Sequence, residues 1–297
     1  MRKPKALVLF SGGLDSLLAK KLLEKQGAKV TTLSFKSYFF NAAQADKVVD
    51  FSKEHLRMVK NPKYGYGKSV NPCIDCHALM LKKAKGIINR EGFDLVATGE
   101  VLGERPMSQN LKALKTVEEQ SSLKGYLLRP LSAKLLEPTV PEEKGIIDRS
   151  KLFDISGRSR KRQMELAKRW GIKKYPQPAG GCLLTDLEFG KKLKELFEIN
   201  PRCDGNDVEL LRYGRHFIQG KTKIIVGRNQ EENDKIKKLA RKGDILVEMK
   251  NYPGPLTLIR NYSKNKINQK FIKKAEDLTQ YYSTKTRDIE GVKFKIS

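Results

Sequence analysis

The sequence predicts an α/β protein in which a parallel-sheet domain is followed by a small α+β domain. Up to about residue 200, short apolar stretches alternate with stretches of helical spacing. This alternation is typical of a parallel sheet whose strands are joined by helices. Beyond residue 200 the pattern changes, and 297 residues are enough for two separate cores. We therefore expect domains at residues 1–200 and 201–297.

The first domain is expected to contain four buried strands joined by helices. The strands are predicted at residues 6–10, 30–35, 93–97 and 126–131. Five leucines at helical spacing predict a first helix that ends near Gly27. Further helices are expected at 43–58, from Cys73 onward, and at 159–170, where the stretch is amphipathic and basic.

The second domain is expected to mix strands and helices over about a hundred residues. Strands are predicted at 222–226 and 244–249, with a helix at 231–242 between them and a turn at 253–255. A helical stripe and an alternating final strand at 292–296 complete the pattern. The stripe consists of Ile267, Phe271, Ala275, Leu278 and Tyr282.

The chain is strongly basic, with 60 Lys and Arg against 34 Asp and Glu and a net charge of +26. A polyanion such as RNA is the natural partner, because each neutralised phosphate releases condensed counterions. The alternative is a solvated lysine-rich surface without a nucleic-acid role. Four cysteines are too few for a secreted disulfide scaffold of this length. No signal-peptide-like segment and no run of 18 apolar residues is present, so we expect a soluble, cytoplasmic protein without a membrane partner.

A short glycine-containing stretch, Ser11-Gly12-Gly13-Leu14-Asp15-Ser16, joins the first strand to the first helix. Glycines let backbone amides approach oxygen atoms closely, and the helix dipole favours negative charge at that end. The stretch therefore predicts an anion site at a helix N-terminus. A purely geometric turn is the alternative for two glycines alone.

The whole string resembles the PP-loop of the ATP pyrophosphatase superfamily, whose members have an adenine nucleotide alpha hydrolase-like fold. The resemblance implies that ATP and Mg²⁺ are cofactors and that Asp15 helps to place the magnesium ion. It further implies that the second nucleotide motif begins at Thr98-Gly99, at the end of another predicted strand. The loop residues implied to hold ATP are Ser11, Gly12, Gly13, Asp15 and Ser16.

Three cysteines form the second chemical feature. Cys73 and Cys76 are spaced to lie on one helix face, at a helix start that is expected to lower their pKa values. Cys182 follows in Pro178-Ala179-Gly180-Gly181-Cys182. Asp75 and His77 flank the first two thiols and are candidates for proton transfer, or else solvated side chains.

Four interpretations of the cysteines remain open. Three thiolates can hold a 4Fe–4S cluster with one open iron. One cysteine can instead carry a persulfide that a second resolves as a disulfide. A structural zinc ion would need a fourth ligand such as His77 or Cys203. Finally, the cysteines can be small buried hydrophobic residues.

The PP-loop, the Asn-Pro-Cys-x-x-Cys string and the later Gly-Gly-Cys together resemble the tRNA thiouridylases. The resemblance implies that a uridine carbonyl is adenylated with release of pyrophosphate and that sulfur then replaces the oxygen. It implies Asp15, Cys73 and Cys182 as catalytic residues. It also implies Cys73, Cys76 and Cys182 as ligands of a 4Fe–4S cluster, since three cysteines match the cluster-type members. The sulfur donor would be sulfide, a cysteine desulfurase or a sulfur carrier.

Two basic regions are candidates for RNA binding. One is the cationic run at the start of the predicted 159–170 helix, where an anion is needed to offset the helix dipole. The other lies in the last hundred residues, which resemble the NFACT-R RNA-binding domain through the strings 215–217, 225–229 and 244–246. The candidate RNA contacts are Arg158, Arg160, Lys161, Arg162, Arg215, His216, Arg228 and Asn229.

The sequence thus favours an ATP-dependent tRNA sulfurtransferase. One alternative is a PP-loop ligase that acts on a small metabolite, although such an enzyme does not need a charge of +26. The other is a non-enzymatic RNA- or ribosome-binding adaptor. The intact loop and the full cysteine set argue against the adaptor.

Overall fold

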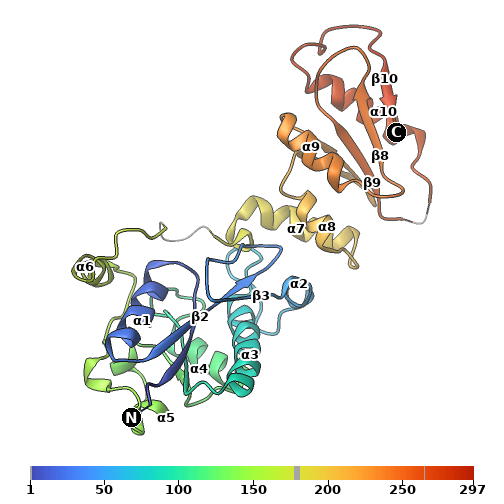
Figure 1. Ribbon diagram of the computed structural model, residues 1–297. Coiled ribbons are helices and arrows are strands. Elements are labelled where there is room, and N and C mark those ends of the chain that lie inside the picture. The colour runs from blue at the N-terminus through green and yellow to red at the C-terminus, as the bar shows by residue number, and fades with distance from the viewer. Residues whose placement is uncertain (1, 177–180, 264) are drawn as a thin grey trace. The chain divides into compact units, whose positions relative to one another are not determined.

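The computed structural model describes residues 2–176, 181–263 and 265–297. The chain forms two compact units, Met1–Asp186 and Leu187–Ser297, each with its own sheet (Figure 1). We expected the division after residue 200. The helix α7 (Leu187–Ile199) is part of the second unit and accounts for the difference.

The first unit is built on a five-stranded parallel sheet, which confirms the predicted α/β class. The strand order is β3-β2-β1-β4-β5, so that β1 lies between β2 and β4. In this register Val8 of β1 lies beside Thr32 of β2 and Ala97 of β4. The strands are β1 (Lys5–Leu9), β2 (Lys29–Lys36), β3 (Lys47–Asp50), β4 (Leu95–Ala97) and β5 (Leu127–Leu128).

Both faces of this sheet are buried, because alternate residues of β1 enter two different cores. Ala6 and Val8 pack with Leu22 and Leu23 of the first helix, whereas Leu7 packs with the helices of the opposite face. Two helices, α1 and α6, pack against each other, and α3 packs against α4 and α2. These helices are α1 (Leu14–Lys25), α2 (Ser52–Lys60), α3 (Cys73–Glu91), α4 (Leu111–Ser121) and α6 (Lys161–Arg169).

The helix predicted at 43–58 is wrong in its first half. Residues 47–50 form the edge strand β3, and helix α2 begins only at Ser52. Asp46 accepts hydrogen bonds from the backbone N–H and the hydroxyl of Thr32, both at 2.7 Å, and so fixes this segment beside β2. Two valines at positions 48 and 49 suit an extended edge strand better than a helix.

Short elements complete the first unit. They include α5 (Val140–Glu143) and three 3₁₀ turns. The turns are Ala133–Leu135, Arg149–Lys151 and Leu183–Thr185. The strand predicted at 126–131 is reduced to β5, and the remainder of that stretch is irregular. In the described residues, no helix is both long and apolar enough to cross a membrane.

The second unit contains a five-stranded antiparallel sheet in the order β10-β8-β9-β7-β6. Two of its strands, β6 and β9, were not predicted. The strands are β6 (Arg215–Gln219), β7 (Thr222–Val226), β8 (Ile245–Met249), β9 (Thr257–Asn261) and β10 (Phe294–Ile296). The helices that follow α7 are α8 (Gly205–Leu210), α9 (Gln230–Leu239) and α10 (Gln269–Tyr281).

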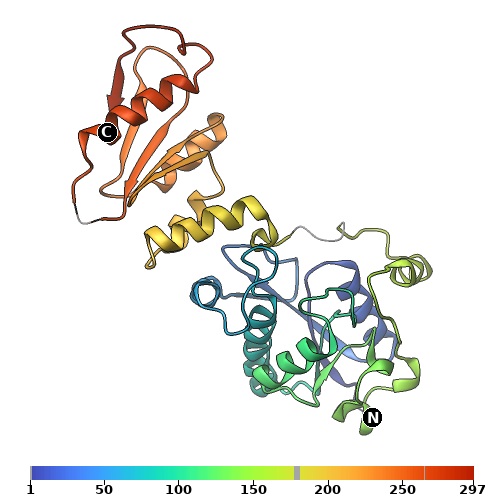
Figure 2. The ribbon, with the colours of Figure 1, turned by 180° about the vertical axis from the view of Figure 1, so that it is seen from behind.

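Helices cover both faces of the second sheet. Ile225 packs with Leu210 and Ile236 of α8 and α9, whereas Ile224 packs with Ala275 of α10 on the other face. Figure 2 shows α10, in red, lying across the strands. The predicted helical stripe therefore does face the sheet, because its members are part of this second cluster.

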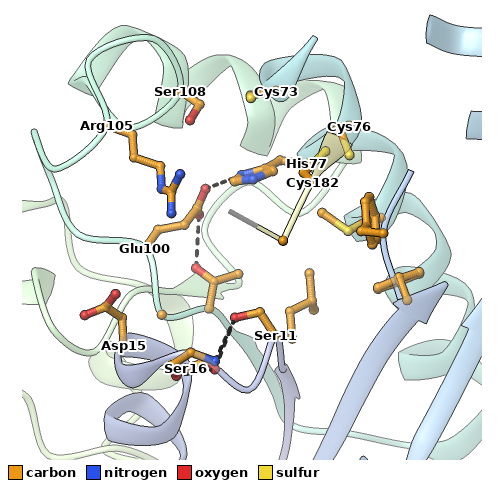
Figure 3. A pocket seen from close by; sticks show the side chains of 18 of the residues that line it. Ser11, Asp15, Ser16, Cys73, Cys76, His77, Glu100, Arg105, Ser108 and Cys182 are labelled. Atoms are coloured by element: carbon orange, nitrogen blue, oxygen red, sulfur yellow. Dashed lines mark hydrogen bonds and ion pairs between the residues drawn. The ribbon is translucent and has the colours of Figure 1, made fainter. Parts of the chain in front are cut away.

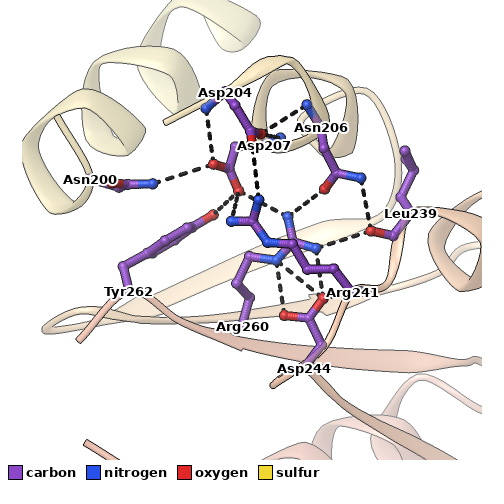
Figure 4. Close-up of polar contacts among 9 residues, drawn as sticks. All are labelled: Asn200, Asp204, Asn206, Asp207, Leu239, Arg241, Asp244, Arg260 and Tyr262. Atoms are coloured by element: carbon purple, nitrogen blue, oxygen red, sulfur yellow. Dashed lines mark hydrogen bonds and ion pairs between the residues drawn. The ribbon is translucent and has the colours of Figure 1, made fainter. Parts of the chain in front are cut away.

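A buried ion network ties α8 to the strands of the second unit (Figure 4). Arg260 of β9, which is 1% exposed, pairs with Asp207 at 2.9 Å and with Asp244 at 2.6 Å. Arg241 also donates to Asp207, at 3.0 Å. Because each buried charge has an opposite charge and hydrogen bonds, the network is satisfied internally and is a structural feature.

Candidate active site of the first unit

The turn between β1 and α1 leaves the N-terminus of α1 open. Gly13 is the N-cap and supplies no side chain to the first backbone N–H groups of the helix. Gly12 has a φ of +75°, a conformation that favours glycine. The hydroxyl of Ser16 donates to the Gly13 carbonyl at 2.8 Å and thereby braces the turn. Free N–H groups at the positive end of a helix are suited to an anion such as a phosphate.

Gly99 brings the end of β4 against this turn. A Cβ atom at residue 99 would lie 2.5 Å from the carbonyl carbon of Asp15 and 2.5 Å from the nitrogen of Ser16. Only glycine therefore allows the Thr98-Gly99 segment to approach the helix start so closely. The two segments are adjacent because β1 and β4 are neighbouring parallel strands, so that the segments following them leave the sheet at the same edge.

A cavity of about 420 Å³ connects this turn with the three cysteines. Figure 3 shows Asp15 and Ser16 at one end and Cys73, Cys76 and Cys182 at the other. The same cavity has an apolar part that suits a planar base. This part is lined by Leu33, Phe35, Phe40, Met80 and Leu81.

Two carboxylates and a guanidinium meet beside the turn. Arg160 lies 3.8 Å from Asp15 and 3.9 Å from Glu104. Burial raises the pKa of Asp15, and the neighbouring Arg160 offsets this only in part. Burial also raises the pKa of Glu104, as does the nearby Asp15. Among the described residues, Oδ1 of Asp15 and Nε of Arg160 are buried without a hydrogen-bond partner. Such atoms are what a bound phosphate and its cation would satisfy.

The four cations of the basic run have different surroundings in the structure, although the sequence predicts all four as RNA contacts. Arg158, Lys161 and Arg162 are exposed, and Arg162 pairs with Asp154 at 2.7 Å. Arg160, whose side chain is only 16% exposed, lines the cavity instead. Helix α6 packs on α1, which carries Asp15, and this packing brings Arg160 to the turn.

All three cysteines predicted to act together line the cavity. The side-chain amide of Asn71 donates to Cys73 Sγ at 3.4 Å. The expected lowering of the Cys76 pKa is wrong. Burial raises the pKa of this thiol well above its ordinary value, and the nearby Cys182 adds to the effect. Burial likewise raises the pKa of Cys182 to about 11. Desolvation in the cavity wall thus outweighs the helix dipole.

The cysteines supply suitable donors for an iron–sulfur cluster without forming a preassembled site. Thiolates are the ligands that such clusters prefer. However, no group of three or more metal-ligating side chains comes together within the part of the chain that the structure describes. Pro178, Ala179 and Gly180 of the Cys182 string lie outside the described residues. Cys203 is buried in the second unit.

A buried polar chain, which sequence reasoning did not identify, runs from the cavity into the core. His77 donates through Nδ1 to Glu100 at 2.7 Å, and Arg129 donates to the other Glu100 oxygen at 2.9 Å. Burial alone would raise the pKa of Glu100, but Arg129 and His77 hold it at about 2. Arg129, 2% exposed, also pairs with Glu118. The signal in the sequence was the Glu100 that directly follows Thr98-Gly99.

The two polar residues that flank the thiols therefore have different surroundings. His77 lines the cavity and is oriented by Glu100. Asp75 accepts hydrogen bonds from the backbone N–H groups of Lys63 and Tyr64, at 3.0 and 3.1 Å. Asp75 thus holds a loop, and only His77 faces the site.

In the second unit, three of the four predicted RNA contacts are already engaged or buried. Both ring nitrogens of His216 are buried, and burial lowers its pKa well below the ordinary value. Arg228 donates to both carboxylate oxygens of Glu232. Asn229 caps α9 by accepting a hydrogen bond from the Glu232 N–H at 2.9 Å. Arg215 is exposed and stacks on Tyr282, and among the described residues it has no carboxylate or capping contact of the kind that holds Arg228 and Asn229.

Two family models match this chain. Residues 2–135 match the model described as Thiamine biosynthesis protein (ThiI). Residues 214–297 match the model described as NFACT protein RNA binding domain. The chain therefore combines a ThiI-type domain, which contains the glycine turn and the first two cysteines, with an NFACT RNA-binding domain. These matches confirm the resemblances to the tRNA thiouridylases and to the NFACT-R domain.

Curated relatives share parts of the chain. A "Probable tRNA sulfurtransferase" of Alkaliphilus metalliredigens is 32% identical over 143 residues, which cover 43% of this chain and 36% of that protein. One of the same name from Finegoldia magna is 31% identical, over 43% of this chain and 36% of the relative. The "tRNA-specific 2-thiouridylase MnmA" of Caldicellulosiruptor saccharolyticus is 23% identical, over 83% of this chain and 78% of that protein. The chain thus spans little more than a third of the first two relatives.

Proposed function

We propose that this protein is an ATP-dependent tRNA sulfurtransferase that replaces a uridine carbonyl oxygen with sulfur. The observation that carries the proposal is the shared cavity: an open helix N-terminus suited to phosphate and three thiols suited to sulfur transfer line one space of about 420 Å³. Activation by ATP and delivery of sulfur must occur at the same uridine carbon, so both functions are needed in one place. The names of the relatives support the same activity.

ATP is held between the turn and the segment that faces it at the end of β4. The backbone around Ser11, Gly12, Gly13 and Ser16 receives the phosphates, and Thr98-Gly99 closes the opposite side. Asp15 and Glu104 supply the oxygen ligands that Mg²⁺ prefers, and magnesium is commonly bound by one or two carboxylates together with phosphates. When bound, the ion offsets negative charge on the phosphates. Arg160 provides a further positive charge at the same place.

The first step activates the uridine. Its carbonyl oxygen attacks the α-phosphorus of ATP, a new oxygen–phosphorus bond forms, and the bond to pyrophosphate breaks. The open N–H groups of α1 and the guanidinium of Arg160 stabilise the charge on the departing pyrophosphate. The carbonyl oxygen, otherwise a poor leaving group, then leaves as part of AMP.

The second step delivers sulfur through the cysteines. One of Cys73 and Cys182 carries a persulfide, whose terminal sulfur attacks the activated carbon and displaces AMP. The other thiol attacks the carrier's cysteine sulfur, which forms a disulfide and releases the thiolated uridine. A thiol reductant then restores both cysteines. A donor that itself carries a persulfide, such as a cysteine desulfurase or a sulfur carrier in that form, transfers its terminal sulfur to one of the thiols and is left with a thiol of its own.

A 4Fe–4S cluster held by Cys73, Cys76 and Cys182 is the alternative way to present sulfur at this place. When bound, such a group offers an iron to which sulfide can attach. Iron and acid-labile sulfide analysis of protein purified anaerobically decides between the two. About four irons per chain indicate the cluster, whereas iron-free protein that still thiolates tRNA indicates the persulfide route.

The RNA partner is tRNA, in keeping with the names of the relatives and the match to an RNA-binding domain. In the first unit the exposed cations Arg158, Lys161 and Arg162 flank Arg160, which lines the cavity. Phosphate contacts from these side chains would hold the RNA near the site without reading its sequence.

Asp15→Ala tests the proposal through tRNA-dependent release of pyrophosphate from ATP. We expect a loss of about two orders of magnitude or more, the size typical of removing one preorganised group that stabilises charge in the transition state. Binding of tRNA should be retained, because Asp15 lines the cavity and is not part of the exposed basic run. Asp50→Ala, which removes an exposed carboxylate on the edge strand β3, is the matched control.

Each other outcome selects a different function. Full activity of Asp15→Ala would contradict the assignment of the nucleotide site. Pyrophosphate release that does not depend on tRNA would favour a ligase acting on a small metabolite. RNA binding without any release of pyrophosphate by the unaltered protein would favour a non-enzymatic adaptor.

A further inference from the structure

We propose that the second unit binds an unpaired RNA base on a surface formed by Arg215, Tyr281, Tyr282 and Arg287, here called the Arg–Tyr platform. The inference rests on the proposed function in that it takes tRNA as the RNA that is bound. It goes further by naming the contact surface and the form of RNA that this surface recognises.

The platform consists of two phenol rings in contact with each other and one guanidinium group over each ring. Arg215 of β6 lies over the ring of Tyr282, with 4.5 Å between the guanidinium carbon and the ring centroid. Tyr281 meets Tyr282 edge to face, at 5.0 Å between centroids, and is 58% exposed. Arg287 lies over the Tyr281 ring at 5.3 Å. The platform thus joins the edge strand β6 to the end of α10.

Neighbouring contacts hold the platform in place before any ligand binds. Phe217, which lies on β6 as Arg215 does, packs against Tyr282 with 6.1 Å between the ring centroids. Arg287 donates through Nε to the Tyr281 carbonyl at 2.9 Å. Gln280 donates to the carbonyls of Thr286 and Ile289, at 3.1 and 2.6 Å, and so closes the loop that carries Arg287. A surface that is already ordered costs less entropy when it binds.

This combination matches an unpaired nucleotide better than a duplex. An exposed tyrosine offers a flat face on which a splayed base can stack, and the guanidinium groups can stack as well as contact phosphates. Bases within an RNA helix are already stacked on each other and do not present a free face. Two lysines on α10, Lys270 and Lys274, add positive charge on the same helix, whereas Lys273 is paired with Glu276 and Asp277.

The other three RNA contacts predicted for this unit are already engaged or buried within the fold. His216 is buried, Arg228 is held by Glu232, and Asn229 caps a helix. Gly227 is required by packing, since a Cβ atom there would lie 2.0 Å from Oδ1 of Asn233. These residues shape the fold, whereas Tyr281 of the platform is 58% exposed, more than the 38% of Tyr252 in the same unit.

The test uses the full-length protein and a single-stranded oligouridylate that carries one 2-aminopurine, with a paired RNA duplex as the second probe. Tyr281→Ala should weaken binding of the single strand by about 5-fold to 100-fold, the range expected for loss of one stacked base. It should also abolish the quenching of 2-aminopurine fluorescence that stacking causes. Binding of the duplex should be unchanged.

Three further variants separate stacking from charge and from folding. Tyr281→Phe keeps the ring and should bind like the unaltered protein. Tyr252→Ala removes a tyrosine that is 38% exposed elsewhere in the unit and should also have no effect. Arg215→Lys should weaken binding while keeping its salt dependence, whereas Arg215→Ala should in addition reduce the log–log salt slope by about 0.7.

Unchanged binding of the single strand by Tyr281→Ala would overturn the platform. So would an equal loss for single strand and duplex, or a loss that Tyr281→Phe shares. The assay needs neither ATP nor thiolation. Failure of the proposed reaction with these binding results intact would therefore leave the platform standing and reject only the enzymatic function.

Discussion

Arg160 has different partners in the structure from the one that the sequence predicts. It belongs to a run of cations that reads as an RNA-binding surface, yet its guanidinium lies between Asp15 and Glu104. Burial raises the pKa values of both carboxyl groups. A positive charge here partly offsets that burial when the cavity is empty and is available to phosphate when the cavity is filled.

Arg160→Ala and Arg158→Ala should therefore affect the binding of different ligands. Arg160→Ala should weaken ATP binding by about 10-fold to 100-fold, since hydrogen bonds to charged groups contribute about 1.5–3 kcal/mol, and should leave tRNA affinity nearly unchanged. Arg158→Ala should leave ATP binding intact and reduce the salt slope of tRNA binding by about 0.7 to 0.9. Calorimetry with ATP and tRNA titrations at several salt concentrations measure both. Equal behaviour of the two variants would reject the division of the basic run.

Residues whose role is set by local chemistry were the ones that the sequence could predict. The turn from Ser11 to Ser16 leaves the N-terminus of α1 without a side-chain cap, and this local feature can be predicted from six consecutive residues. Glu100 and Arg129 are separated by 29 positions and meet only because β4 and β5 are paired. The cysteine spacing predicted proximity correctly, but the Cys76 pKa depends on burial that a spacing does not contain.

At the scale of elements, the errors concern strands at sheet edges and strands with mixed polarity. The strand β3 alternates exposed and half-buried residues, whereas the sequence predicts it as part of a helix. The strands β6 and β9 carry Arg215, Gln219 and Arg260, so their apolar pattern is weak. Arg260 is buried only because Asp207 and Asp244 pair with it, and such compensation is not visible in a pattern of hydrophobicity.

The aromatic cluster that packs β2 against α2 should make the first unit sensitive to acid. His55 stacks on Phe51 at 4.7 Å, its Nδ1 lies 2.6 Å from the Ser37 hydroxyl, and burial lowers its pKa from 6.5 to about 4. Below pH 6.5 the unfolded chain binds a proton that the folded chain does not. The free energy of unfolding should therefore fall by up to about 3 kcal/mol as the pH decreases from 6.5 to 4.

Fluorescence of Trp170, the single tryptophan of the chain, follows unfolding of the first unit. Denaturant unfolding at several pH values should show this slope, and His55→Phe should remove most of it. Carboxyl groups with lowered pKa values contribute equally in both proteins and cancel in the comparison. An identical pH dependence in the variant would show that His55 is not buried as a neutral ring.

At the scale of the whole molecule, the site combines four distant parts of the chain. The turn after β1, the end of β4, the start of α3 and the Cys182 segment all line one cavity. Parallel pairing of β1 with β4 explains the first two, and the packing of α3 against β1 and β4 explains the third. The sequence supplied the parts, and their assembly follows from the sheet order, which a pattern of apolar stretches does not specify.

The most direct test of the central claim is nucleoside mass spectrometry of tRNA incubated with the protein, ATP, Mg²⁺, a sulfur donor and a thiol reductant. We expect a uridine in which one oxygen is replaced by sulfur. The product should be lost with Cys182→Ser, which removes a thiol at the cavity, and retained with Cys203→Ala, which alters a cysteine of the second unit. Absence of any thiolated nucleoside with the unaltered protein, or undiminished product with Cys182→Ser, would contradict the account.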